Sequence, residues 1–214
     1  MERDIICAIA SSANIEILKI EEIINEREAG QCFIKRNDRH MFDRYPGNNS
    51  IELLPHQKLY FDHDMKTIVI PDLNIRSFLT AQNTTSAPKI LYDSRRYKTI
   101  ISDLISFVSI QPHLIPIMRN GKPIQFFGFK EDWDEEAKIY ILHAVGRLKN
   151  GIPNPKSRPV VQLPWEISFN IKMYETINIT FNSLYNIFSE GGIRVGLGSG
   201  RGLGFGRFEV LKWE

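Results

Sequence analysis

The sequence predicts an α+β fold in which helices cover one face of an antiparallel sheet, and three observations lead to this. Residues Trp165–Tyr174 alternate apolar and polar side chains, which is typical of a half-buried strand. Apolar residues recur at three- and four-residue spacing within Tyr97–Ile110 and Phe181–Phe188, which indicates amphipathic helices. Two apolar runs within Lys58–Pro71 flank a polar turn, which predicts a hairpin.

The first half of the chain adds further elements in order. The β-branched runs Ile5–Ala10 and Asn14–Ile20 predict strands that form a first hairpin. Residues 21–50 are charged and weakly periodic, so we expect an insertion there. After the hairpin of residues 58–71, Asp72 is expected to cap a helix. Residues 112–128 hold three prolines, which favours irregular or edge-like structure.

In the second half, Lys138–Leu148 predicts a strand. Lys149–Pro159 is rich in proline and glycine and is expected to be a polar loop. The helix that begins at Phe181 is expected to end at Gly191-Gly192 as its C-cap, and Phe208–Trp213 predicts a last strand.

Length and composition indicate one globular domain over residues 1–214. Hydrophobic residues make up 43% and charged residues 24%, which excludes a disordered chain. No apolar run reaches the ~18 residues of a membrane helix, so we expect no membrane partner. The two cysteines have no metal-ligand spacing and are interpreted as buried thiols of a cytoplasmic protein. A net charge of +2 is too small to imply nucleic acid by itself.

Glycines near the carboxyl end give the most informative pattern. They alternate strictly at positions 196, 198, 200, 202, 204 and 206. In an extended segment this spacing places every glycine on one face, which another backbone can approach closely. Arg194, Arg201 and Arg207 accompany them, with no acid between Gly191 and Phe208. Exposed amides and guanidinium groups suit a phosphate–sugar chain, although a hairpin kept for tight packing explains the spacing equally well. The spacing is not that of a dinucleotide-binding fingerprint.

Two further basic groups are candidates for the same ligand. Between Leu142 and Trp165 there are four basic residues and no acid, namely Arg147, Lys149, Lys156 and Arg158. They are a clamp for a nucleic-acid backbone if they share a groove with the glycine segment, and a solvated loop otherwise. Arg76, Arg95 and Arg96 form a third set, near Tyr92 and Tyr97, which could stack on bases. The glycine ligands that we select from the tail are Gly198, Gly200 and Gly202.

The pattern of titratable residues does not favour an enzyme. No two of the five histidines stand at zinc-site spacing, and no nucleophile elbow is present. His63, between two aspartates, is better explained as a turn residue than as a metal ligand. His143, on the strand before the basic loop, is the one histidine that we would test for metal-independent RNA cleavage. We expect neither a metal nor a cofactor.

The ending Gly196-Leu197-Gly198 to Phe205-Gly206-Arg207-Phe208-Glu209-Val210 resembles the C-terminal signature of the repeat-associated mysterious protein (RAMP) superfamily. Its members are RNA-binding subunits of CRISPR effector complexes. The chain is most similar to small phage-encoded proteins of this type, in the hairpin of residues 59–71 and in Arg158-Pro159-Val160 before Trp165. The likeness covers roughly residues 53–110 and 138–214, and the segment Ser199–Gly204 departs from it.

The resemblance implies a ferredoxin-like βαββαβ module with insertions, located in the cytoplasm of a host if the protein is phage-encoded. It implies single-stranded nucleic acid as a ligand, RNA more than DNA, and self-association or other effector subunits as partners. We therefore expect sequence-tolerant binding, with assembly along the strand as a corollary. Two alternatives stay open: an endoribonuclease of the same superfamily, and a protein-only assembly component whose glycine face packs against a neighbouring subunit.

Overall fold

A computed structural model describes the chain at residues 2–11, 32–33, 59–62, 65–81, 86–93, 95–127, 133–147, 153–198, 201 and 204–214. Of the predicted insertion at residues 21–50, only Cys32 and Phe33 fall within these ranges. None of the helices in the described ranges is both long enough and apolar enough to cross a membrane.

The main sheet is antiparallel and has two long central strands. Strand β1 (Glu2–Ser11) pairs along its whole length with β12 (Trp165–Tyr174) and on its other side with β13 (Glu209–Trp213). The far edge of β12 pairs with β5 (Val108–Gln111) and, at one residue, with β7 (Met118–Arg119), which continues to β8 (Lys122–Pro123). The order β13-β1-β12-β5 places the first and third strands of a βαββαβ unit in the centre, as in a ferredoxin-like module.

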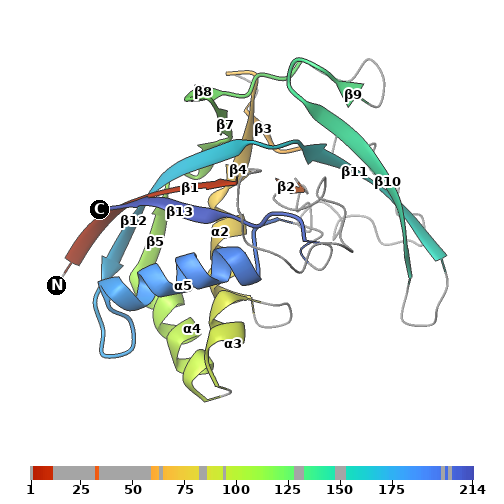
Figure 1. Cartoon of the computed structure of the whole chain (residues 1–214). Helices are drawn as coiled ribbons and strands as arrows, with labels where there is room; N and C mark the ends of the chain where they lie inside the picture. The colour runs from red at the N-terminus through yellow and green to blue at the C-terminus, as the bar shows by residue number, and fades with distance from the viewer. Residues whose placement is uncertain are drawn as a thin grey trace, which may run out of the picture.

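The helices pack against one face of this sheet (Figure 1). They are α2 (Asp72–Thr80), α3 (Ala87–Leu91), α4 (Arg96–Phe107) and α5 (Phe181–Arg194). Alternate residues of β12 are buried, from Trp165 to Met173, because that face of the strand meets the helices. Phe169 lies 6.0 Å, centroid to centroid, from Phe188 of α5, and Phe188 lies 5.5 Å from Phe78 of α2. The expected α+β fold, with helices on one face of an antiparallel sheet, is confirmed.

Two smaller sheets extend the module. Strands β3 (Phe61–Asp62), β4 (Thr67–Pro71) and β6 (Leu114–Pro116) form one of them. Strands β2 (Cys32–Phe33), β11 (Pro153–Val161), β10 (Ile139–Arg147) and β9 (Trp133–Asp134) form the other. The β10–β11 hairpin reaches away from the helical layer (Figure 1).

Arg119 joins the second of these sheets to the main one. Its guanidinium group donates to three backbone carbonyls, those of Ala137 (2.6 Å), Gln162 (2.6 Å) and Pro164 (3.0 Å). Burial lowers the pKa of Arg119. The three carbonyl dipoles therefore stabilise a half-buried cation and fix the base of the β10–β11 hairpin.

Two predictions for the first half of the chain were right and three need correction. The hairpin of residues 58–71 is confirmed as β3–β4, and Tyr97–Ile110 is helical over most of its length. However, the segment from Val108 onward forms β5, so the predicted helix was too long. Asp72 does not cap α2 with its side chain, and pairs instead with Arg76 at 3.3 Å and His113 at 3.2 Å.

The predicted first hairpin is wrong, because over Cys7–Ala10 strand β1 already has β12 on one side and β13 on the other. No edge of this stretch is left for the Asn14–Ile20 segment, which itself lies outside the described residues.

The second half of the chain also differs from expectation at two places. The loop predicted over Lys149–Pro159 is a strand from Pro153 onward. Its prolines at positions 153, 155 and 159 differ in position by two and four residues, so they all lack their N–H group on the same edge of the strand. The ladder with β10 on the opposite edge therefore forms. Helix α5 does not end at Gly191-Gly192 but continues to Arg194, with Val195 as its C-cap.

Glycines 191 and 192 serve packing instead. A methyl group on Gly191 would lie 2.5 Å from Cβ of Ala87, and one on Gly192 would lie 2.5 Å from the Phe208 carbonyl oxygen. These glycines let α3 and the returning chain approach the last turn of α5.

Candidate nucleic-acid interface

The glycine segment is a compact turn rather than an extended strand. Gly196, Gly198, Gly204 and Gly206 have φ between 75° and 89°, the left-handed region that favours glycine. The amide of Leu197 donates to the Gly206 carbonyl at 2.8 Å, and the amide of Phe208 donates to the Gly192 carbonyl at 3.2 Å. The predicted bare face of an extended chain is therefore wrong for these residues, because the two ends of the segment fold onto each other.

This turn also settles where several of its amides point. Those of Gly196 and Gly204 donate to the carbonyls of Gly191 (3.1 Å) and Arg201 (3.2 Å). Gly198 is half-buried, and Gly200 and Gly202 lie outside the described residues. The described amides mostly hold the turn together, so its charged side chains are the better candidates for contacts with an anion.

Arg201 and Arg207 form a pair of like charges in this turn. The Nη2 of Arg207 lies 3.5 Å from the backbone carbonyl oxygen of Arg201, and its Nη1 is buried without a hydrogen-bond acceptor among the described residues. Burial lowers the pKa of both arginines, and the charge of Arg201 lowers the pKa of Arg207 further. The neighbouring charge of Arg201 and partial burial both disfavour the charged form of Arg207, so an anion bound at Arg207 would be stabilising.

The turn packs against the β10–β11 hairpin. Phe205 and Val160 are both fully buried and form one cluster, with Tyr140 and Leu142 packed against it. In the hairpin register Tyr140 faces Val160, and Leu142 faces Arg158. Because side chains alternate along a strand, Arg158 belongs to the face of the hairpin that Phe205 covers. The structure thus places the glycine turn next to the basic hairpin. From the sequence, this proximity could only be assumed.

The other predicted residues of the hairpin divide between its two faces by register. Position 156, opposite Ala144, lies two residues from Arg158 and on the same face. Position 147, opposite Pro153, lies on the other face, as does His143, whose side chain is exposed. Lys149 lies outside the described residues. His143 is therefore not on the face that Phe205 covers.

The remaining predicted arginines lie in the helical layer. Arg194 is exposed in the last turn of α5, directly before the glycine turn. Arg76 of α2 already pairs with Asp72. Asp93 accepts from the amides of Arg95 and Arg96, both at 2.9 Å, and the Arg96 guanidinium lies 5.0 Å from the Tyr92 ring centroid. The side chains of Arg76 and Arg96 thus have intramolecular partners. Nowhere in the described ranges do three His, Cys, Asp or Glu residues gather as a metal ion would require.

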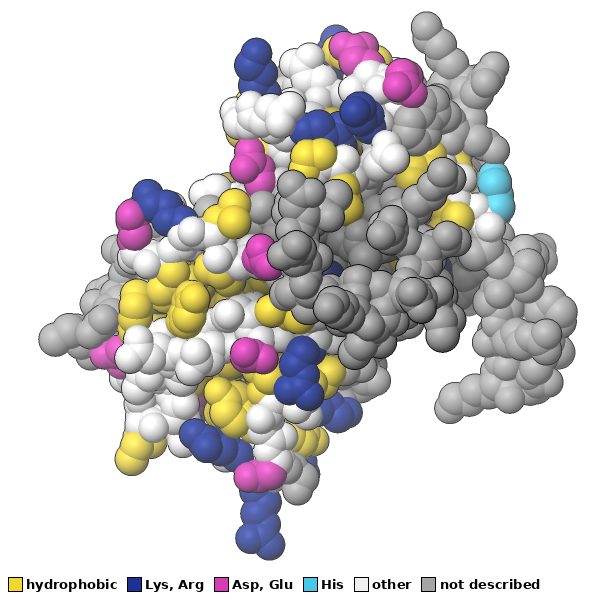
Figure 2. All heavy atoms as spheres, viewed as in Figure 1, with side chains coloured by type: hydrophobic (Ala, Val, Ile, Leu, Met, Phe, Trp, Pro, Cys, Tyr) yellow, Lys and Arg dark blue, Asp and Glu magenta, His cyan; other side chains and the backbone are white. Residues whose placement is uncertain are grey.

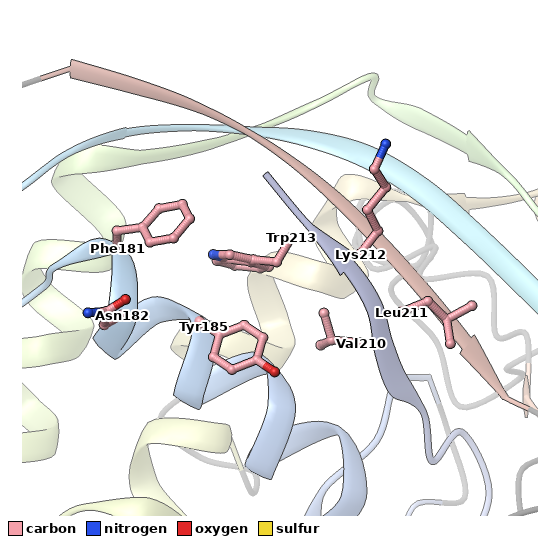
Figure 3. Close-up of a pocket in the computed structure, with 7 residues that line it drawn as sticks. All are labelled: Phe181, Asn182, Tyr185, Val210, Leu211, Lys212 and Trp213. Atoms are coloured by element: carbon pink, nitrogen blue, oxygen red, sulfur yellow. The ribbon is translucent and has the colours of Figure 1, made fainter.

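A groove between α5 and β13 was not predicted. It has a volume of about 350 Å³ and lies between the first turns of the helix and the last strand. It is lined by Phe181, Asn182, Tyr185, Val210, Leu211, Lys212 and Trp213 (Figure 3). Hydrophobic side chains gather at this place on the surface (Figure 2). In the sequence these aromatic residues matched an ordinary amphipathic helix and an ordinary strand, so no signal distinguished the groove.

Comparison with known proteins supports the fold. No protein-family model and no curated protein matches the chain. Among solved structures, the chain is similar over its full length to a chain in the "Cryo-EM structure of the Type III-B Cmr-beta bound to cognate target RNA". The TM-score is 0.56 and the sequence identity is 11%, and the match covers 60% of that chain. The fold is shared at this level of identity, and the present chain spans about three fifths of the length of the chain it matches.

Proposed function

We propose that this protein binds single-stranded nucleic acid without sequence preference, RNA more than DNA, by its phosphate backbone. The observation that supports this most is the pair Arg201–Arg207, in which the buried Nη1 of Arg207 has no acceptor among the described residues. A phosphate oxygen would supply that acceptor and would neutralise the mutual repulsion of the two guanidinium groups. Neither group reads a base, so the contact is independent of sequence.

The neighbouring hairpin extends this site. Arg158 lies on the face that Phe205 covers, and Lys156 belongs to the same face by register. Arg158 and Arg194, at the end of α5, therefore add two cations on the elements that adjoin the turn, and position 156 is a further candidate by register alone. Three or four neutralised phosphates are a reasonable expectation for such a set. Gly198, Gly200 and Gly202 remain predicted ligands through their amides.

The preference for RNA rests on the solved structure with the same fold, a Type III-B Cmr-beta complex bound to cognate target RNA. The resemblance of the carboxyl-terminal motif to RAMP proteins points in the same direction. Assembly of several copies along one strand stays a prediction, which the binding stoichiometry on long strands would test.

The decisive experiment measures affinity for a labelled single-stranded RNA by fluorescence anisotropy between about 50 and 200 mM salt. Three or four phosphate contacts give a log–log slope of about −2 to −3 for a single strand. Arg207→Gln removes one charge from the pair and is expected to reduce the magnitude of the slope by about 0.7. Lys98→Gln, an equal change of charge at an exposed position of α4, is the matched control and should leave the slope unchanged.

A wild-type protein that does not bind RNA even at low salt would exclude this function. A wild-type slope near zero, or an Arg207→Gln slope equal to that of the wild type, would exclude the proposed site. Competition by single-stranded DNA of the same length separates the RNA preference from the backbone contact, because only the former depends on the 2′-hydroxyl group.

A further inference from the structure

The groove between α5 and β13 has aromatic walls and a hydrogen-bond donor without a partner. Trp213 lies with its ring centroid 5.6 Å from that of Tyr185, 5.9 Å from Phe181 and 5.5 Å from Phe188. The indole Nε1 is buried, yet it finds no acceptor within the part of the chain that the structure describes. A buried N–H without an acceptor is rare in folded proteins, so a bound group that accepts from it would be stabilised.

The side chains at the mouth of the groove suit a flat polar ring. Tyr185 is 39% exposed, and its ring stands edge-on to the Trp213 ring at an interplanar angle of 66°. The exposed part of the Tyr185 ring is therefore available for stacking. Asn182, exposed on the same side of α5, carries both a donor and an acceptor (Figure 3). The volume of about 350 Å³ lies within the usual range of about 300–1,000 Å³ for small-molecule pockets.

An added β-strand is a poorer occupant of this place. Strand β13 forms the edge of the main sheet, but its register shifts between Ala8 and Ile9 of β1. Lys212 pairs with Ala8 and Val210 with Ile9, so Leu211 has no opposite residue and forms a bulge. Bulges and lysines on an edge strand oppose pairing with another chain. The groove therefore favours a ligand that inserts a ring over a peptide that pairs with the edge of β13 through its backbone.

The groove is continuous with the arginine pair along the chain. Arg207 is three residues from Val210 and six from Trp213, which corresponds to about 10 and 20 Å of extended strand. A flexible polymer held at Arg207 by a phosphate can therefore reach the groove with a unit a few positions further along the strand. A nucleobase combines the planar ring, the acceptor atoms and the anionic backbone that these two places require.

We propose that the α5–β13 groove binds a nucleobase of the same strand whose phosphates lie at Arg201–Arg207. The base stacks on Tyr185 and accepts a hydrogen bond from the Trp213 indole. This inference rests on the proposed function, and it adds a contact to bases that is independent of salt. The contact is tolerant of sequence, since every base has a face for stacking and an acceptor atom.

The test compares two RNA strands of equal length at one low salt concentration, one with bases and one abasic. Tyr185→Leu keeps an apolar side chain but removes the ring, and it is expected to weaken binding of the strand with bases about 5- to 150-fold. The same variant should bind the abasic strand as the wild type does. Tyr174→Leu, at a 51% exposed tyrosine of β12, is the matched control and should change neither affinity.

Fluorescence gives a second readout that a merely structural effect would not produce. Trp165 is buried and Trp213 lines the groove, so in a Trp133→Phe background, which removes the third tryptophan, binding of RNA should quench part of the tryptophan emission. Trp213→Phe keeps a ring against Phe181 and Tyr185 but removes the N–H. It should abolish this quenching and weaken binding of the strand with bases, with a melting temperature close to that of the wild type.

The outcomes are distinct. If Tyr185→Leu and Trp213→Phe bind the strand with bases as tightly as the wild type while the salt slope persists, the groove proposal is wrong and the backbone site stands. If these variants change only the oligomeric state in sedimentation, the groove is a protein contact and the proposal is equally wrong. If no strand binds at low salt, both the proposed function and this inference fall.

Discussion

The substitution Gly206→Ala tests why glycine stands in the turn between α5 and β13. Gly206 has φ of 75°, and a methyl group on it would overlap the backbone carbonyl oxygen of Leu197. Gly204 provides a matched control in the same turn, because its φ is 89° but a methyl group there meets nothing within 4 Å. The two variants share the backbone cost and differ in the close approach.

The expected magnitudes follow from these two terms. A left-handed backbone costs a non-glycine residue about 1–2 kcal/mol, and Gly204→Ala should lose no more than that. Gly206→Ala adds overpacking of about 1–3 kcal/mol and weakens the Leu197–Gly206 hydrogen bond, which is 2.8 Å long, by about 1 kcal/mol. The difference of about 2–4 kcal/mol corresponds to a melting temperature about 4–16 °C lower for a domain of this size.

The assay is thermal unfolding followed by circular dichroism, with urea unfolding as a check on the free energy. Equal melting temperatures for Gly204→Ala and Gly206→Ala would refute the reasoning, because the methyl group would then not meet the Leu197 carbonyl. The same pair of variants also separates packing from binding. Gly204→Ala should bind RNA as tightly as the wild type, since its amide already donates to Arg201.

Three further predictions concern stability and reactivity. Arg119→Lys can keep one of the three carbonyl hydrogen bonds, so the free energy of unfolding in urea should fall by about 2–4 kcal/mol; no change would show that these bonds do not hold the hairpin. Thr180→Ala removes the capping box of α5 and should cost about 0.5–2 kcal/mol in the same assay, whereas an unchanged midpoint would contradict that role. Burial raises the pKa of the Cys7 thiol, so in a Cys32→Ser background iodoacetamide should label the protein only after unfolding; rapid native labelling would contradict the burial of β1.

The sequence was most informative where one periodicity stood alone. The alternation over Trp165–Tyr174 predicted β12 to the residue, because one face of that strand is buried along its whole length. Near Val108 two periodicities overlap, since Val108 and Ile110 fit both the helix spacing before them and an alternating strand. Pairing with β12 makes this segment a strand. The spacing of apolar residues within the segment carries no information about a partner that is distant in the sequence.

Glycine and proline were the least reliable guides, because both act through backbone geometry that composition does not specify. Proline-rich Pro153–Val161 looked like a loop, yet its prolines occupy one edge of a strand. The alternating glycines suggested an extended chain, yet Gly196 and Gly206 adopt positive φ and close a turn.

For the candidate site, the residue types were predicted but their grouping was not. Arg201 and Arg207 are six residues apart, and their pairing depends on the turn between them. The hairpin joins this pair through Phe205 and Val160, which are 45 positions apart in the sequence, and neither residue had been selected. The aromatic groove was missed because Tyr185 and Trp213 meet only once β13 lies beside α5.

The position of β1 has a consequence for how the molecule is made. Its neighbours β12 and β13 emerge from the ribosome more than 150 residues after this strand. The apolar side chains of β1, such as Ile9, therefore remain without their native neighbours until β12 and β13 have been translated. Contacts so distant in sequence slow folding and leave the nascent strand open to aggregation. Chaperone dependence during expression is thus expected to follow from the sheet order itself.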